Sequence, residues 1–168
     1  VWKKPRPVPN SWSSPIVIRD ETKPQVITCG DPWVIAYAAS DGAELWRAKC
    51  LRADIGPSPV FDNGIVYTVS EFPHLSAIRT DGQGDVTETH IAWTADIGLP
   101  DTCGPLVTND YVLLLASYGT LTCYDKKEGG EPLWEMDFDG NFRSSPGLLG
   151  NRFFPLIEEG TAWIVELG

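Results

Sequence analysis

Two residue markers recur in step along this chain, and their spacing constrains the fold more than any other feature. A tryptophan preceded by an apolar residue or alanine stands at Trp2, Trp46, Trp93 and Trp134. A short motif that ends in proline follows each tryptophan after 12 or 13 residues, as SSP, PSP, CGP and SSP. Two markers that stay in register over four copies indicate an internal repeat of about 42 residues.

Each repeat carries the same series of short apolar runs separated by turn residues. In the first repeat the runs are PIVIRD, QVITC, WVIAYAA and the segment around Trp46. A glycine-containing turn follows the third run of each copy, at Gly42, Gly82, Gly130 and Gly168. Four short strands joined by tight turns predict an all-β protein, a β-propeller of four-stranded antiparallel blades. No segment shows a sustained helical period, so helix is nearly excluded.

The markers also predict the boundaries of the blades. We expect one propeller domain over residues 1–168, with repeats at about 12–50, 56–98, 103–140 and 144–168, the last of them incomplete. The second repeat has an insertion at 83–89, and residues 1–4 are expected to be the fourth strand of a preceding blade. Three arrangements remain open: a fragment of a longer propeller, a closed four-bladed ring completed by residues 1–4, or two chains joined head to tail into eight blades. We favour a fragment or a half-propeller over the closed ring.

The tryptophan of each repeat has a structural interpretation. Its strand is predicted to be the outer edge of the blade, where an indole covers the seam between neighbouring blades. The indole N–H can there donate a hydrogen bond to a backbone carbonyl. Stacking of blades explains the recurrence, because one blade alone cannot bury both of its faces.

Charge and cysteine content exclude some classes of function and leave others open. The formal net charge of −10 argues against binding to nucleic acid. No apolar run is long enough for a membrane-spanning helix. The four cysteines have neither a paired motif nor metal-type spacing, so their disulfide state stays undetermined. Cys50 and Cys103 are expected on one face of the propeller, whereas Cys29 and Cys123 are expected to pack as small apolar side chains.

Polar residues gather in the connections between the fourth strand of one blade and the first strand of the next. These connections should emerge on one face, and they carry Asp54, Asp96, Asp101, Asp139, Asn141 and Arg143. One interpretation is a loop surface for ligand binding or a weak calcium site. The interpretation we favour is that the recurring aspartates satisfy backbone N–H groups at the strand ends. His74 and His90 have no partners in a catalytic motif.

The segment from Ile35 to Trp46, with apolar and alanine positions, Gly42 and the terminal tryptophan, resembles the pyrroloquinoline-quinone (PQQ)-like propeller repeat. That family includes quinoprotein alcohol dehydrogenases and the outer-membrane-assembly lipoprotein propeller. The resemblance implies seven or eight blades in a complete ring and an extracytoplasmic location in a bacterium, periplasmic or secreted. In the quinone-dependent members it implies PQQ with calcium, held beside adjacent cysteines. This sequence has no adjacent cysteines, so we expect no cofactor.

The function expected from the sequence is that of a non-catalytic scaffold. It would bind a protein partner, or a second copy of itself, through its loops or through an exposed blade edge that accepts a strand. Two alternatives are part of a quinone-dependent dehydrogenase, and a carbohydrate-binding propeller that uses Trp12, Trp33 or Phe142 as a stacking platform.

Overall fold

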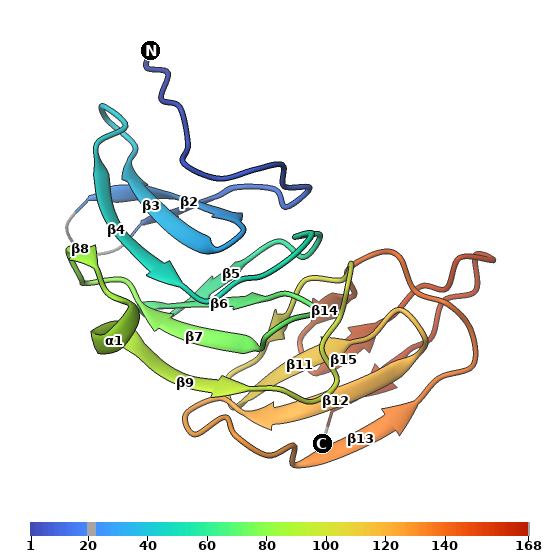
Figure 1. Cartoon of the computed structure of the whole chain (residues 1–168). Helices are drawn as coiled ribbons and strands as arrows, with labels where there is room; N and C mark the ends of the chain where they lie inside the picture. Colours follow the sequence, from blue (N-terminus) through green and yellow to red (C-terminus); the bar gives the residue numbers. More distant parts are fainter. Residues whose placement is uncertain (20–22, 168) are drawn as a thin grey trace.

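The computed structural model describes residues 1–19 and 23–167, which form four sheets that succeed one another along the chain (Figure 1). The predicted all-β propeller architecture is confirmed, because, apart from the short strand β8 (Gly84–Asp85), the strands of each sheet are antiparallel and follow one another in sequence order. The first sheet contains β1 (Ile16–Arg19), β2 (Pro24–Gly30), β3 (Trp33–Ala38) and β4 (Glu44–Lys49). The second contains β5 (Val60–Asp62), β6 (Ile65–Val69), β7 (Leu75–Arg79) and β9 (Ile91–Ala95).

The third and fourth sheets differ in how complete they are. The third contains β10 (Leu106–Val107), β11 (Tyr111–Leu115), β12 (Thr120–Asp125) and β13 (Trp134–Asp137). The fourth contains β14 (Gly147–Leu149), β15 (Arg152–Phe154) and β16 (Val165–Glu166). Within the described residues, β16 therefore pairs only with β15. We call the four sheets blades 1 to 4.

Three hydrophobic cores fill the seams between successive blades. Side chains alternate across each strand, so a buried strand such as β11 or β12 supplies residues to the seam on either side. In blade 3, Val112, Leu114 and Tyr124 face blade 2, whereas Leu113 and Cys123 face blade 4. The middle strands are buried on both faces, which explains their nearly continuous apolar sequences.

The insertion at 83–89 contains two elements that the sequence did not predict. It forms β8 (Gly84–Asp85) and a one-turn helix, α1 (Thr87–His90). The expectation of no helix was wrong here because a single turn is too short to show a helical period. Strand β8 pairs in parallel with β4. The outer edge of blade 1 is therefore covered by a fifth strand, which comes from the segment that links β7 and β9 of blade 2.

The N-terminal segment lies outside the four sheets. Residues 1–4 form no strand and do not join the sheet of blade 4. The segment instead runs along blade 1 (dark blue in Figure 1), where Trp2 lies 6.5 Å from the ring of Tyr37 and Val8 packs against Gly30. That residues 1–4 are the fourth strand of a preceding blade stays a prediction, because residues 1–168 contain no blade before blade 1.

Candidate functional site

The four marker tryptophans occupy related places in the seams, with very different exposure. The indole of Trp2 donates to the carbonyl of Ala39 at 3.0 Å, and the indole of Trp93 donates to the carbonyl of Lys126 at 3.0 Å. Both acceptors lie in the turn after the third strand of the next blade. Trp46 is fully buried, and its N–H donates to Oε1 of Gln25 at 2.9 Å. Trp134 is 39% exposed, and its indole N–H makes no hydrogen bond to a described residue.

The glycines of these turns explain how the indoles can approach so closely. Gly42 has φ +71°, and a Cβ there would lie 2.5 Å from the ring of Trp2. The equivalent residue beside Trp93 is Gly129, which has φ +59°, and a Cβ there would lie 2.2 Å from the ring of Trp93. A Cβ at the neighbouring Gly130 would meet only open space. Gly82 has no positive φ and packs against Val86 and His90. Gly168 lies outside the described residues.

Trp134 is exposed because it borders a groove between blades 3 and 4. The groove has a volume of about 340 Å³ and a mainly apolar lining. We call it the blade-edge groove, and its lining residues are Tyr111, Trp134, Met136, Val165, Glu166 and Leu167. Trp134 and Met136 pair with Cys123 and Leu121 of β12, which places both side chains on the face toward blade 4. The sequence marked Trp134 but gave no signal for Met136 or Tyr111.

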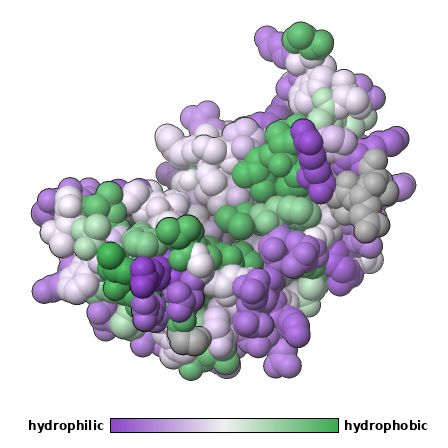
Figure 2. Space-filling view, turned by 180° about the vertical axis from the view of Figure 1, so that it is seen from behind, coloured by the Kyte–Doolittle hydropathy of each residue, from purple (hydrophilic) through white to green (hydrophobic). Residues whose placement is uncertain are grey.

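Further exposed apolar side chains lie outside the lining of the blade-edge groove. Around blade 4 these are Leu133, Leu149, Leu156, Trp163 and Ile164, with exposures from 42% to 74%. The space-filling view from behind shows apolar residues gathered in patches among polar ones, and the N-terminal segment projecting from the body (Figure 2). Apolar surface gathered in this way is typical of interaction sites.

The polar loop residues singled out in the sequence do not form one cluster. Arg143 contacts Oδ2 of Asp101 at 3.8 Å and Oε1 of Glu158 at 3.4 Å, which ties two connections to the turn of blade 4. The backbone carbonyl of Asn141 accepts a hydrogen bond from the N–H of Glu158. Asp96 and Asp139 are exposed and form no ion pair with a described residue. Glu158 had no repeat signal and was not predicted.

The three candidate stacking platforms differ in how exposed their rings are. Phe142 is fully buried in the core between blades 3 and 4, so its proposed role as a platform was wrong. Trp33 is half-buried, and the guanidinium of Arg47 lies 4.8 Å from the centre of its ring. Trp12 is 66% exposed. Asp54, also exposed, lines the same pocket as Trp12.

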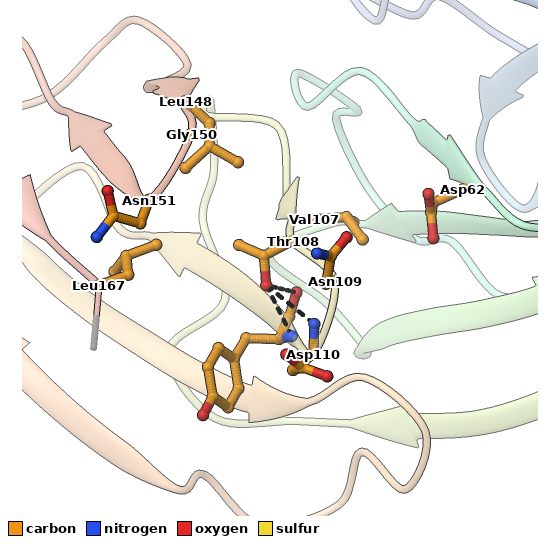
Figure 3. A pocket seen from close by; sticks show the side chains of 10 residues that line it. Asp62, Val107, Thr108, Asn109, Asp110, Leu148, Gly150, Asn151 and Leu167 are labelled. Carbon is orange, nitrogen blue, oxygen red and sulfur yellow. Dashed lines mark hydrogen bonds between the residues drawn. The ribbon is translucent and has the colours of Figure 1, made fainter.

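A pocket of about 460 Å³ lies among the tips of the first hairpins of blades 2, 3 and 4 (Figure 3). Several polar groups of its lining already form hydrogen bonds or ion pairs with neighbouring residues. The hydroxyl of Thr108 accepts from the N–H of Tyr111 at 2.9 Å and from that of Asp110 at 3.3 Å. Asp62 pairs with Lys126, whose ammonium also donates to the carbonyl of Thr108 at 2.9 Å. These groups hold blades 2 and 3 together, which is a structural role.

Except where they form ion pairs, the titratable side chains of the described residues lie apart from one another or are buried in the blade cores. All four cysteines are buried, unpaired thiols, and burial raises the pKa of Cys29 and Cys103 to about 11. Burial also lowers the pKa of His74, an effect that nearby Asp96 opposes. Among the described residues, no three His, Cys, Asp or Glu side chains are grouped as metal ligands. With no adjacent cysteines for a platform, the residues present do not fit PQQ and calcium.

Comparisons with known proteins place this architecture in a family. A family profile described as outer membrane protein assembly factor BamB matches residues 30–89 and 84–166. No curated protein matches the chain. No helix in the described part of the chain has the length and apolar character to cross a membrane.

Solved structures similar to the chain share its fold at low sequence identity. The computationally designed Ika4 protein is 11% identical, with 96% of each chain covered and a TM-score of 0.70. BamB from Moraxella catarrhalis is 14% identical over 99% of this chain, with a TM-score of 0.56. A quinohemoprotein alcohol dehydrogenase from Pseudomonas putida HK5 is 20% identical over 87% of this chain, with a TM-score of 0.65. The chain spans 63% of that BamB and 28% of that dehydrogenase.

Proposed function

Because this chain belongs to the PQQ-like propeller family described as outer membrane protein assembly factor BamB, we propose that it is a non-catalytic module that binds a partner protein. The observation that carries this proposal is the blade-edge groove, an apolar depression beside the outer strand of blade 3. The partner contributes an extended segment that pairs with β13 and fills the groove.

The outer edge of blade 3 supports this mode of binding. In blade 1 the outer strand β4 pairs with β3 on one side and with the added strand β8 on the other, so an outer strand of this repeat can accept a further strand. Strand β13 has β12 on one side and no described strand on the other. An open edge presents N–H and C=O groups that an added strand satisfies, and such pairing is a common way for a sheet to bind a peptide.

The side chains beside this edge supply the rest of the binding energy. An apolar residue of the incoming strand that faces blade 4 would contact Trp134 and Met136, which are 39% and 37% exposed. Covering them removes apolar surface from water, at about 25 cal/mol for each Å². Tryptophan is enriched among residues that dominate binding energies, so Trp134 is the expected anchor. The net charge of −10 favours a basic partner.

A peptide with the sequence of β4, ELWRAK, is a suitable probe because it is a natural fourth strand of this repeat. We expect the fluorescein-labelled peptide to bind the 168-residue chain in an anisotropy titration. A peptide with proline in place of the leucine should bind much more weakly, since proline lacks the N–H that pairs with an edge. Met136→Arg should weaken binding of the original peptide about tenfold or more, because it places a charge in the apolar groove.

Leu149→Arg is the matched control, since Leu149 is 74% exposed on blade 4 but does not line the groove. This variant should bind the peptide as the parent chain does. The proposal is wrong if no binding occurs at about 1 mM peptide, where a binding free energy of only about 4 kcal/mol would be detected. It is also wrong if the two variants weaken binding equally.

We further propose that the protein works outside the cytoplasm of a bacterium. The support is the family description, which names an outer-membrane assembly factor. An antibody against the chain should detect it in the periplasmic or secreted fraction of cells that produce it from its native gene. Detection only in the cytoplasmic fraction would contradict this location.

A further inference from the structure

A second pocket lies on the loop face beside blade 1, away from the blade-edge groove. Its volume is about 350 Å³. We call it the Trp12 pocket, and its lining residues are Pro9, Asn10, Trp12, Asp31, Ala53 and Asp54. It combines one exposed indole with two carboxylates. The lining contains no lysine or arginine side chain.

The backbone that carries Trp12 is fixed to the body of the protein. The N–H groups of Trp12 and Ser13 both donate to the carbonyl of Ile55 at 3.0 Å, and Ile55 is fully buried. The N–H of Ser14 donates to the hydroxyl of Ser58 at 2.9 Å. The indole is therefore exposed to solvent on a segment whose backbone is already fixed. Binding of a ligand then costs less conformational entropy of the protein than binding to a mobile segment would.

The carboxylate of Asp31 is held in place as well. Oδ2 of Asp31 accepts a hydrogen bond from the N–H of Ala53 at 3.2 Å. Ala53 has φ +69°, a conformation that costs free energy in a residue with a Cβ, so this bond helps to fix the loop that carries Asp54. Neither Asp31 nor Asp54 forms an ion pair with a described residue, and both charges remain uncompensated.

The repeat does not require a tryptophan at this position. Trp12 stands three residues before Pro15, and the corresponding residues before Pro59, Pro105 and Pro146 are Gly56, Thr102 and Arg143. Its ring makes no contact with another described aromatic ring. A large apolar side chain that is mostly exposed and absent from the other copies adds little to the packing of the blades.

We propose that the Trp12 pocket binds the guanidinium group of an arginine side chain from a protein partner. A guanidinium is planar, so it stacks on an indole while its N–H groups donate to carboxylates. A sugar ring would also stack on Trp12, but as a neutral ligand it would leave the charges of Asp31 and Asp54 without a partner. The charge of the pocket therefore favours the cation over the saccharide.

The experiment compares two peptides that differ only in charge. Acetyl-Gly-Arg-Gly-amide and its citrulline analogue, which is nearly the same shape but neutral, are titrated into the ¹⁵N-labelled chain. We expect the arginine peptide to shift the indole N–H signal of Trp12, with binding that weakens as salt is added. The citrulline peptide should bind at least about fivefold more weakly. Asp54→Asn should weaken arginine binding by a similar factor, and Trp12→Ala should abolish it.

Trp163→Ala serves as the control variant, because Trp163 is 42% exposed and lies outside the pocket. It should bind the arginine peptide as the parent chain does, and unchanged circular dichroism should show that each variant is folded. Equal binding of the two peptides would overturn the proposal. So would unchanged binding by Trp12→Ala, or binding of maltotriose at Trp12 without binding of arginine. None of these results depends on the blade-edge groove, so the two sites are tested independently.

Discussion

Replacing Trp46 with alanine should destabilise the protein far more than the same change at Trp134, although both residues occupy the same position in the repeat. Trp46 is fully buried in the seam between blades 1 and 2, packed against Ala36 and Val86. Truncation of a buried tryptophan costs about 3–5 kcal/mol of unfolding free energy. Trp134 is 39% exposed and has no hydrogen bond to lose within the described residues, so we expect about 2 kcal/mol or less.

The hydrogen bond of the Trp46 indole makes a separate contribution. Its acceptor, Oε1 of Gln25, belongs to a buried side chain whose Nε2 donates to the carbonyl of Thr80 at 3.3 Å. Trp46→Phe keeps an aromatic ring but leaves Oε1 of Gln25 without that donor. An unsatisfied buried acceptor costs about 1–3 kcal/mol. The phenylalanine variant should therefore lie between the parent chain and Trp46→Ala in stability.

The measurement is urea unfolding of the parent chain and the three variants, followed by circular dichroism. If Trp46→Ala is too unstable to fold, Trp46→Phe still tests the argument. A shift in the midpoint at constant slope would report a change in stability alone. Equal losses for alanine at Trp46 and at Trp134 would refute the idea that the marker tryptophans stabilise the fold by covering seams.

Two further predictions concern the turns and the thiols. Gly129→Ala should destabilise the protein by more than Gly130→Ala in the same unfolding assay. Both residues have positive φ, so alanine costs about 1 kcal/mol of unfolding free energy at either position. Only at Gly129 would the added Cβ also meet the ring of Trp93, at 2.2 Å. Equal losses of unfolding free energy in the two variants would contradict this contact. Burial raises the pKa of Cys29 to about 11 and that of Cys50 to about 12, from an ordinary 9.0. The unfolded chain loses these protons from about pH 9, and the folded chain loses them only near pH 11–12. The contribution of the thiols to the unfolding free energy should therefore be fully present below pH 9. Above pH 9 the unfolding free energy should fall by up to about 1.4 kcal/mol per thiol for each pH unit. A urea midpoint that stays constant or rises from pH 8 to about pH 10.5 would show that the buried thiols do not contribute in this way.

The repeated architecture could be predicted from the sequence because its signals are local. The Trp46, Trp93 and Trp134 strands are β4, β9 and β13, each the fourth strand of a blade. The Asn63-Gly64 turn has positive φ at both residues, as a two-residue hairpin requires. Strand β11 is apolar along nearly its whole length because both of its faces are buried between neighbouring sheets. Stacking of the sheets buries the middle strands in the same way, so the apolar runs recur along the sequence.

The binding features were less predictable because each depends on departures from the repeat. Trp12 was predicted only as one of three candidate stacking platforms, and nothing in the sequence joined it to Asp31 or Ala53. The loop residues Asp54, Asp101 and Arg143 share a face in the repeat pattern, yet only Asp101 and Arg143 contact each other. Phe142 resembled an exposed platform because it lies in a loop, but that loop folds inward and buries its ring.

The sequence by itself determined that this chain repeats a small antiparallel sheet four times, with an indole in the outer strand of each of the first three copies. Periodicity and turn residues report on backbone conformation within about 42 residues, and that range is enough to define a blade. Only the tertiary structure decided which copies of the indole are buried. Trp46 is covered because residues 83–90 fold over the edge of blade 1, whereas Trp134 faces the groove beside β16. Exposure depends on what a neighbouring blade supplies, and a repeat position carries no information about its neighbour.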